Sequence, residues 1–212
     1  MIMPKTTPAT NSLSVPQPGM PVRTDSRVVS IMQPYFFPYI GYFQLIKQAD
    51  VFVFFDDVQY IQRGWINRNR ILLEGALHWI TLPICNGGRH LAINERHYKL
   101  DPVSSRKILP RIEAAYRKSP RFSEIFAVVK HIMNSGIRNV AEFNANLIQV
   151  VAADLGIRTR FALSAEIVND KHLRGQARIL EICRCLGATH YVNPSGGMPL
   201  YQAERFADQG MQ

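Results

Sequence analysis

VVSIMQPYFFPYIGYF, residues 28–43, decides the fold expected for this chain. Val28 to Met32 are apolar apart from one serine, as a buried strand requires, and Pro34 ends the strand because proline has no N–H for the ladder. Residues 39–49 then repeat apolar side chains at helical spacing, and residues 51–55 form a second apolar run. Strand, helix and strand in this order predict a βαβ unit with two parallel strands and a right-handed crossover.

The rest of the chain alternates between strand and helix patterns. Two short strands are expected at residues 66–73 and 77–84, with a hairpin across Glu74-Gly75. Further helices are expected after Asp101-Pro102, at 122–133, after the capping pair Asn139 and Glu142, and at 172–186, with strands at 160–164 and 189–192. This alternation predicts an α/β fold with a mostly parallel, Rossmann-like sheet and a helical second half.

Composition sets the class of protein and of partner. The chain has 212 residues, of which 47% are hydrophobic and 19% charged, enough to bury the core of one domain. The formal net charge of +9 favours phosphate-bearing partners such as nucleotides, nucleotide sugars, RNA or an anionic membrane surface. The three cysteines lack a paired C-x-x-C motif, so neither a disulfide nor structural zinc is expected.

The first 27 residues differ in composition from the remainder. They are rich in proline, serine and threonine and poor in large apolar side chains, so we expect a disordered tail at 1–27 followed by a single α/β domain at 28–212. No apolar run approaches the length of a membrane span, and the beginning of the chain lacks the layout of a secretory signal. A cytoplasmic protein is therefore expected.

The first candidate site segment is the aromatic loop at residues 33–42, between the first strand and its helix. Ligands of open α/β sheets bind at this edge, where helix N-termini offer free N–H groups to anions. Gln33, Tyr35, Gly41 and Tyr42 are the candidate substrate-binding residues here, and Gln33 needs polar partners because it leaves a buried strand directly. The alternative is that the aromatic rings only pack in the core and the prolines only shape turns.

The second segment, Asp56-Asp57-Val58-Gln59-Tyr60, follows the second strand and is expected at the same sheet edge as Gln33. Two adjacent carboxylates can hold a divalent metal such as Mg²⁺, bind ribose or sugar hydroxyls, or act as a general base. Asp56 and Asp57 are thus the candidate catalytic residues, and Gln59 is a candidate for substrate binding. Alternatively, an aspartate at a strand exit caps the following turn.

The third segment runs from Arg63 to Ile71. As a strand, it would place Trp65, Asn67 and Asn69 on one face and Arg68 and Arg70 on the other. All five are candidate substrate-binding residues, since paired guanidinium groups bind phosphate or carboxylate bidentately. The alternative is an edge strand protected by charge.

Other segments carry weaker signals. The loop at residues 85–90 is glycine-rich and basic, and it could close over a phosphate, although it matches no Walker or dinucleotide fingerprint. The six histidines show no standard metal-ligand spacing, so no metal ligand is assigned. Ser195 lacks a G-x-S-x-G elbow, and Cys183 lies on the apolar stripe of a helix, so no nucleophile is evident.

With these segments in view, the sequence resembles the WbqC-like family, whose members tend to occur in O-antigen and other surface-polysaccharide gene clusters. The blocks that carry the resemblance are residues 31–43, 56–60, 65–70, 81–84, 186–191 and Ser195-Gly196. The resemblance implies a role in making or decorating polysaccharide sugars, and it adds Ser195 to the candidate substrate-binding residues. It also implies a truncated chain, because family members continue beyond a segment like residues 206–210 into a further strand.

A second similarity concerns the fold. Strand, glycine-containing loop and helix follow one another as in nucleotidyltransferases of the HIGH-motif type, whose loop carries H-x-G-H. The comparable positions here read Tyr39-Ile40-Gly41-Tyr42, without histidine. A neutral tyrosine offers no cationic donor, so nucleotide binding is expected to persist while adenylyl transfer is not.

Two functions remain open from the sequence. The first is a group-transfer enzyme, acyl or aminoacyl more than nucleotidyl, that acts on a nucleotide-linked sugar in O-antigen biosynthesis. Arg68 and Arg70 would hold its phosphate, and Asp56 or Asp57 would be the base or a ligand of a sugar hydroxyl. The second is a non-catalytic module that binds a nucleotide sugar or RNA. The need for Mg²⁺, the oligomeric state and the donor stay open in both.

Overall fold

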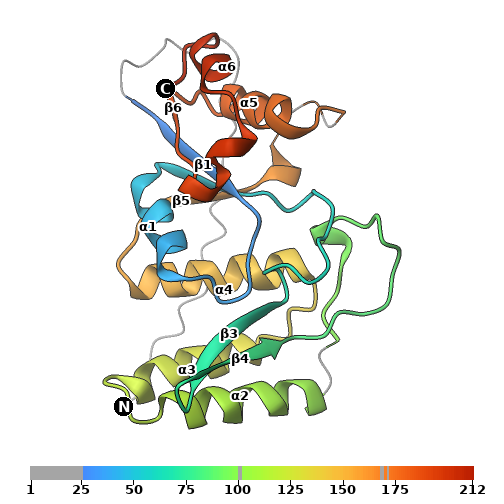
Figure 1. Ribbon diagram of the computed structural model, residues 1–212, viewed down its shortest axis with the longest axis vertical. Helices are drawn as coiled ribbons and strands as arrows, with labels where there is room; N and C mark the ends of the chain where they lie inside the picture. Colours follow the sequence, from blue (N-terminus) through green and yellow to red (C-terminus); the bar gives the residue numbers. More distant parts are fainter. Residues whose placement is uncertain (1–25, 100–101, 168–169, 171) are drawn as a thin grey trace.

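The computed structural model describes residues 26–99, 102–167, 170 and 172–212. Its centre is a four-stranded sheet in the order β5-β2-β1-β6, and every neighbouring pair is parallel (Figure 1). The four strands are β1 (Val28–Met32), β2 (Val51–Phe54), β5 (Arg160–Leu163) and β6 (His190–Tyr191). Helix α1 (Ile40–Gln48) joins β1 to β2, so the predicted βαβ unit and the α/β class are confirmed.

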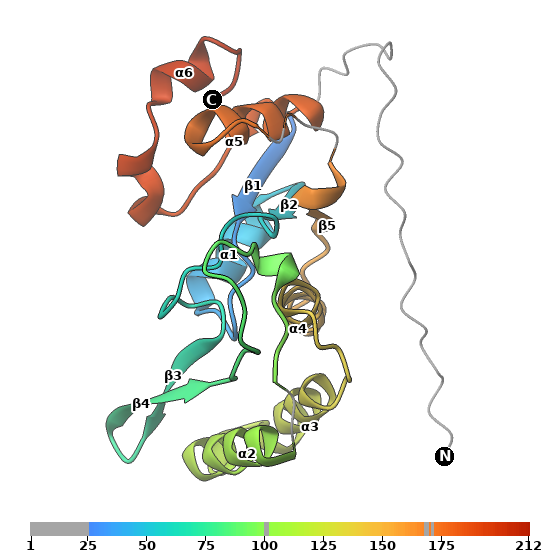
Figure 2. The same cartoon turned by 90° about the vertical axis from the view of Figure 1, so that its right-hand side faces the viewer.

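Strand β2 shows why the sheet is covered on both faces. All four of its residues are buried, as expected for a central parallel strand. Phe52 and Phe54 belong to a hydrophobic cluster with α1 and α4 (Val140–Asp154). Val51 and Val53 belong to a second cluster with α5 (Gly175–Cys185) and α6 (Ala203–Ala207). Alternation along one strand therefore places α1 and α4 on one face of the sheet and α5 and α6 on the other (Figures 1 and 2).

The predicted hairpin consists of β3 (Arg68–Leu73) and β4 (Ala76–Thr81), which pair antiparallel in a separate two-stranded sheet. Glu74 and Gly75 both have positive φ, 52° and 78°, as a two-residue hairpin turn requires. The hairpin lies beside α2 (Pro102–Tyr116) and α3 (Phe122–Met133), at the opposite end of the molecule from α5 and α6 (Figures 1 and 2). It is not part of the parallel sheet.

Most predicted helices are confirmed, with shifts at their ends. The Asn139 side chain accepts hydrogen bonds from the N–H groups of Ala141 and Glu142, 3.0 and 3.2 Å away, and so caps α4. The helix predicted to begin at residue 172 begins at Gly175 instead, because Arg174 is extended and Gly175 has a φ of 55°. Three short 3₁₀ segments complete the fold: η1 (Ile93–Glu95), η2 (Ser164–Glu166) and η3 (Ser195–Leu200).

Two sequence-based predictions concern residues beyond the described part. The predicted cap Asp101 lies outside it, as do residues 1–25 of the expected tail. Arg27, at the end of that expected tail, is described: its N–H donates to Thr189 Oγ1 at 2.7 Å and its Nη1 to the Leu186 carbonyl at 2.6 Å. Among the described residues, none of the helices has the length and apolar character needed to cross a membrane.

Candidate functional site

A pocket of about 700 Å³ opens at the carboxyl ends of β1, β2 and β6. Among the residues that the structure describes, those that line the pocket (its described lining) combine aromatic rings with amide, hydroxyl and guanidinium groups: Gln33, Tyr35, Tyr39, Phe55, Trp65, Asn69, Arg70, Asn193, Ser195 and Tyr201. The remaining described lining residues are Ile31, Met32, Pro38, Ile61, Pro194, Gly196, Gly197 and Leu200. Its position matches the edge at which open α/β sheets bind ligands, and its size suits a small molecule.

Buried Asn144 of α4 holds together the two loops that form one side of this pocket. Its Nδ2 donates to the carbonyl oxygens of Pro34 and Ile66, at 2.9 and 2.7 Å. The Tyr98 hydroxyl lies 2.9 Å from Asn144 Oδ1 and 3.0 Å from the same Ile66 carbonyl. Burial raises the pKa of Tyr98 well above its usual value, so the hydroxyl keeps its proton. This buried network fixes the loop of residues 33–39 against the loop of residues 63–67.

Asn69 of β3 holds the aromatic loop from the pocket side. Its Nδ2 lies 3.2 Å from the Phe36 carbonyl oxygen and 2.6 Å from that of Phe37, while its Oδ1 accepts from the Arg70 N–H at 2.7 Å. Phe37 has a φ of 46°, a left-handed conformation that is uncommon outside glycine. The predicted substrate-binding Asn69 therefore lines the pocket and also stabilises a strained turn of its rim.

Trp65, Arg70, Trp79 and Arg68 form an aromatic and cationic cluster beside the pocket. The two indole rings lie 5.5 Å apart, and Arg70 Cζ lies 5.4 Å from the Trp65 ring and 5.5 Å from the Trp79 ring. Arg68 Cζ lies 4.2 Å from the Trp79 ring. Such contacts of a guanidinium with an aromatic face are attractive.

This cluster corrects the predicted arrangement of the third segment. Trp65 was expected on the face opposite Arg70, but β3 begins only at Arg68, so strand alternation does not govern Trp65 and its ring lies against Arg70. The two arginines, Arg68 and Arg70, also have different roles. Arg70 lines the pocket, whereas Arg68 donates to the carbonyl oxygens of Gly64 and Arg63 outside its described lining.

Two predicted substrate-binding residues are buried behind the pocket. Tyr42 is 1% exposed, its hydroxyl donates to the Gln33 carbonyl at 2.9 Å, and burial raises its pKa well above the usual value. Asn67 is 8% exposed; it accepts from the Tyr60 hydroxyl at 2.8 Å and donates to the Leu82 carbonyl at 3.0 Å. Neither residue belongs to the described lining, so both support the residues around the pocket and do not face its interior.

Gly41 and Gln59 also lie off the described lining. Gly41 is in α1 under the Tyr39 ring, where an added Cβ would lie 2.3 Å from Tyr39 Cε2. Exposed Gln59 donates to the Arg89 carbonyl at 3.1 Å. By contrast, the predicted residues Gln33, Tyr35, Trp65, Asn69, Arg70 and Ser195 meet at the pocket.

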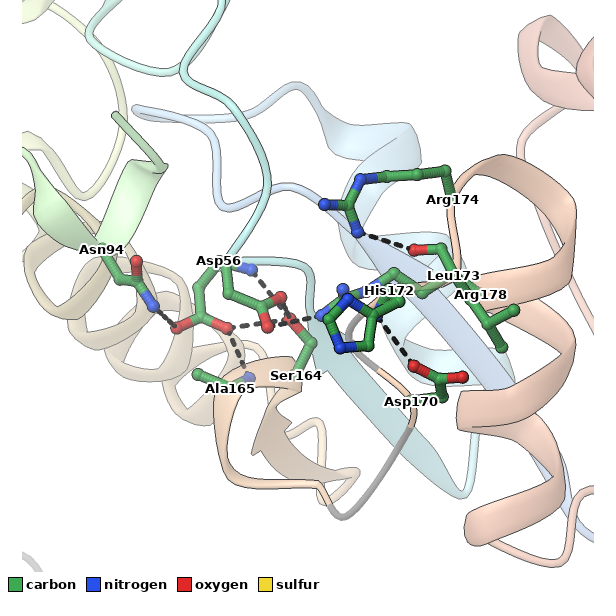
Figure 3. A network of polar contacts seen from close by, with 10 residues as sticks. Asp56, Asn94, Ser164, Ala165, Asp170, His172, Leu173, Arg174 and Arg178 are labelled. Carbon is green, nitrogen blue, oxygen red and sulfur yellow. Dashed lines mark hydrogen bonds and ion pairs between the residues drawn. The ribbon is translucent and has the colours of Figure 1, made fainter. Parts of the chain in front are cut away.

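Asp56 and Asp57 lie at the same sheet edge, at the carboxyl ends of β2 and β5. Figure 3 shows Asp56 within a network of polar contacts. Asp56 is 2% exposed and accepts from Ser164 Oγ at 2.9 Å, the Ala165 N–H at 3.0 Å and Asn94 Nδ2 at 3.1 Å. Asp57 lies 2.5 Å from Ser164 Oγ and 2.5 Å from Arg178 Nη2. Neither carboxylate belongs to the described pocket lining.

Phe55 links this network to the pocket. Its ring lines the pocket, and the Arg178 Cζ of the network lies 5.6 Å from the ring centroid. The network thus contacts the pocket wall through one aromatic side chain. The predicted meeting of Gln33 and the two aspartates at one edge is correct, but a packed residue separates the carboxylates from the pocket.

The chemistry of the network suits an ion pair better than a cation site. Arg178 and Ser164 already contact the oxygens with which Asp57 would hold a metal such as Mg²⁺. Within the described residues, no group of three or more His, Cys, Asp and Glu side chains is placed to hold a metal ion. Cys183 is buried, and burial raises the pKa of its thiol to about 12, so it does not supply a thiolate nucleophile.

Several residues of the site were missed from the sequence. The sequence pattern could have indicated Asn144, because this residue interrupts the apolar stripe of a predicted helix, and a buried amide needs hydrogen-bond partners. Asn193 directly follows a predicted strand, and Ser164 is the last residue of another. Both positions lie at the carboxyl end of a strand, where open α/β sheets bind their ligands. Arg178 lies within a helix, and no local pattern pointed to its pairing with Asp57.

Comparison with known proteins identifies the class. The model of the WbqC-like protein family matches residues 33–212, so this chain belongs to the WbqC-like protein family. It is also 34% identical over 186 residues, 85% of this chain and 78% of the relative, to "Uncharacterized protein Rv1507c" of Mycobacterium tuberculosis (strain ATCC 25618 / H37Rv). No solved structure gives a significant match.

Proposed function

We propose that this protein binds a nucleotide-linked sugar in the pocket and acts on it by group transfer, acyl or aminoacyl, in the biosynthesis of a surface polysaccharide such as O-antigen. The observation that carries the proposal is the combination of Arg70 with the Trp65 ring on one wall of a pocket of about 700 Å³. A cytoplasmic location is part of the same proposal.

Each part of such a ligand finds matching chemistry in the pocket. A guanidinium such as that of Arg70 binds phosphate oxygens through charge-assisted hydrogen bonds. The exposed part of the Trp65 ring offers a surface on which a base can stack. The amides of Gln33 and Asn193 and the hydroxyl of Ser195 offer donors and acceptors for sugar hydroxyls.

For the transfer step, we propose that Asp57, with Asp56 beside it, acts from behind the Phe55 wall of the pocket by holding Arg178 and the negative charge at this edge. Transfer forms a bond between the acyl carbon and a hydroxyl or amine of the sugar and breaks the bond between the acyl carbon and the donor, whose leaving group takes up the proton of the attacking atom. Asp57 is the more accessible of the two carboxylates, with a side chain 12% exposed, whereas Asp56 is 2% exposed.

A second candidate is a non-catalytic module that binds a nucleotide sugar or RNA. It is favoured by the engagement of both carboxylates with Ser164 and Arg178, which gives them a structural use. It is also favoured by the described pocket lining, which contains no Asp, Glu, His or Cys.

A thermal-shift screen with product detection tests these candidates. The full chain is heated with nucleotides, nucleotide-linked sugars, acyl-CoA and aminoacyl-tRNA, each with and without Mg²⁺, and mass spectrometry then follows the sugar in mixtures of a bound sugar with each donor. A rise of Tm with nucleotide-linked sugars and a mass increase of the sugar support the enzyme. Binding without any product supports the module, and no rise of Tm with any nucleotide-linked sugar contradicts both small-molecule proposals.

The role of Asp57 needs its own variant. Asp57→Asn keeps the shape of the side chain but removes its charge and its ion pair with Arg178, so the fold loses stability. At a temperature at which circular dichroism shows the variant to be folded, turnover should be abolished while sugar binding persists. Turnover equal to that of the original chain would remove Asp57 from the chemistry.

A further inference from the structure

Arg96, which follows η1, is a buried arginine without an anionic partner in the described part of the chain. It is 5% exposed, and its buried Nε has no hydrogen-bond partner. The ion pairs found between described residues are Arg121–Glu124, Arg178–Asp57 and Arg184–Glu181, and none includes Arg96. Its guanidinium instead lies 5.1 Å from the centroid of the Tyr60 ring. A buried charge in this state is costly, and a bound anion would offset that cost.

The glycine-rich loop at residues 85–90 lies directly on this guanidinium. A Cβ added to Gly87 would lie 2.8 Å from Arg96 Nη1 and 2.9 Å from Leu91 Cδ1, so only a glycine allows the loop to approach the guanidinium this closely. Both ends of the loop are anchored: the Cys85 N–H donates to the His97 carbonyl at 2.8 Å, and the Arg89 carbonyl accepts from Gln59. The loop is therefore held in place over Arg96.

The backbone of this loop offers unused donors. The N–H groups of residues 86–90 donate to no acceptor within the described residues, and the next N–H, that of Leu91, bonds to the Gly88 carbonyl at 3.4 Å. Backbone N–H groups that have no acceptor within the protein can donate hydrogen bonds to a bound anion. Arg89 and His90 add basic character to the same loop.

We propose that Arg96 and the backbone of residues 86–90 form a binding site for a phosphate group of a small molecule, separate from the pocket that contains Arg70. A phosphate fits better than a carboxylate, because a run of N–H donors together with a guanidinium needs more acceptor oxygens than the two of a carboxylate. None of these residues belongs to the described pocket lining, so the proposal does not depend on the proposed function.

The electrostatic surroundings agree with an anion. Burial raises the pKa of Tyr60, whereas the positive charges of Arg96 and Arg68 both act to lower it. Glu95, the acidic neighbour of Arg96 along the chain, accepts from the Ala92 N–H at 2.7 Å and makes no ion pair with Arg96. The positive charge at this loop is thus left for a ligand.

Titration of the full chain with inorganic phosphate, followed by two-dimensional NMR of the backbone amides, tests the site. We expect saturable shifts at Gly87, Gly88 and their neighbours, with matching shifts for a nucleoside monophosphate. Arg96→Met retains length and apolar packing but removes the guanidinium, and it should weaken phosphate binding about tenfold or more. Gly87→Ala keeps the guanidinium and should weaken binding as well, because the new Cβ would push Arg96 Nη1 and the loop apart.

Two controls make the outcome specific. Arg117→Ala removes an exposed arginine elsewhere and should leave phosphate binding unchanged, and Arg70→Ala should leave the shifts at residues 86–90 in place. Absence of shifts at these amides, or full binding in both Arg96→Met and Gly87→Ala, would overturn the proposal. So would a response to a short single-stranded RNA without any response to phosphate. If Arg96→Met does not fold, the phosphate affinity of Gly87→Ala and the phosphate-induced shifts of the backbone amides in the original chain decide whether the site exists.

Discussion

Arg178 Nη2 lies 2.5 Å from Asp57 Oδ2; the Arg178 side chain is buried, 5% exposed, and the Asp57 side chain is largely buried, 12% exposed. The two residues are 121 positions apart in the chain, one in α5 and the other just beyond β2. Their pairing fastens α5 to the edge of the sheet at which the pocket opens. Through Phe55, which Arg178 also contacts, the pair supports the pocket wall.

Arg178→Met should therefore be strongly destabilising. The change leaves the Asp57 carboxylate buried without this partner, and breaking a buried pair from one side costs about 3–5 kcal/mol of the free energy of unfolding. Urea denaturation followed by circular dichroism measures the loss. Arg184→Met is the matched control, because its ion pair with Glu181 is formed by a side chain 67% exposed and should contribute about 0–1 kcal/mol. Equal effects of the two changes would disprove a structural role for the buried pair.

Asn144→Ala should weaken both the fold and the pocket. It removes the donors to the Pro34 and Ile66 carbonyls and the acceptor next to the Tyr98 hydroxyl, so we expect a loss of about 2–4 kcal/mol. Gln149→Ala on the exposed face of the same helix should change stability by less than about 0.5 kcal/mol. A cost for Asn144→Ala no larger than that of the control would show that the two loops do not depend on this amide.

Gly41→Ala should weaken ligand binding with little change in the stability of the fold. The new Cβ would meet the Tyr39 ring, which is 61% exposed and free to turn away, so the free energy of unfolding should change by less than about 1 kcal/mol. Displacement of Tyr39 alters the pocket lining, and we expect weaker binding of a nucleotide-linked sugar in calorimetry. Gln44→Ala, exposed on the same helix, should leave affinity unchanged. Full affinity in Gly41→Ala would exclude the Tyr39 ring from the site.

The two tryptophans provide an optical test of stacking. Only Trp65 belongs to the described pocket lining, although Trp79 lies 5.5 Å from it. A base stacked on Trp65 should quench the intrinsic fluorescence, and Trp65→Phe should remove most of the response while Trp79→Phe keeps it. The same response in both variants would place the base elsewhere.

The parallel core and much of the site edge could be predicted from the sequence because their signals are local. Apolar runs at residues 28–32 and 51–55 define β1 and β2, and the helical spacing between them defines their connection. The carboxyl ends of parallel strands share one edge, so the meeting of Gln33 and Asp56 follows from the βαβ unit alone.

What could not be predicted depends on contacts between distant segments. Arg178 contacts Asp57 from α5, which is distant from Asp57 in the sequence. The orientation of Trp65 toward Arg70 depends on where β3 begins, and a periodic pattern predicts the start of a strand only to within a few residues. The same holds for Arg96, whose lack of an anionic partner is visible only once the chain is folded.

Titration calorimetry with Arg70→Ala tests the central proposal most directly. The nucleotide-linked sugar that gives the largest thermal shift is titrated into the original chain, into Arg70→Ala and into Arg117→Ala, at low and high salt. Binding to Arg70→Ala should be about tenfold weaker at low salt and less affected at high salt, with unchanged stability and an unchanged Arg117→Ala control. Equal affinity of Arg70→Ala and the original chain at low salt would contradict phosphate binding by Arg70 in this pocket.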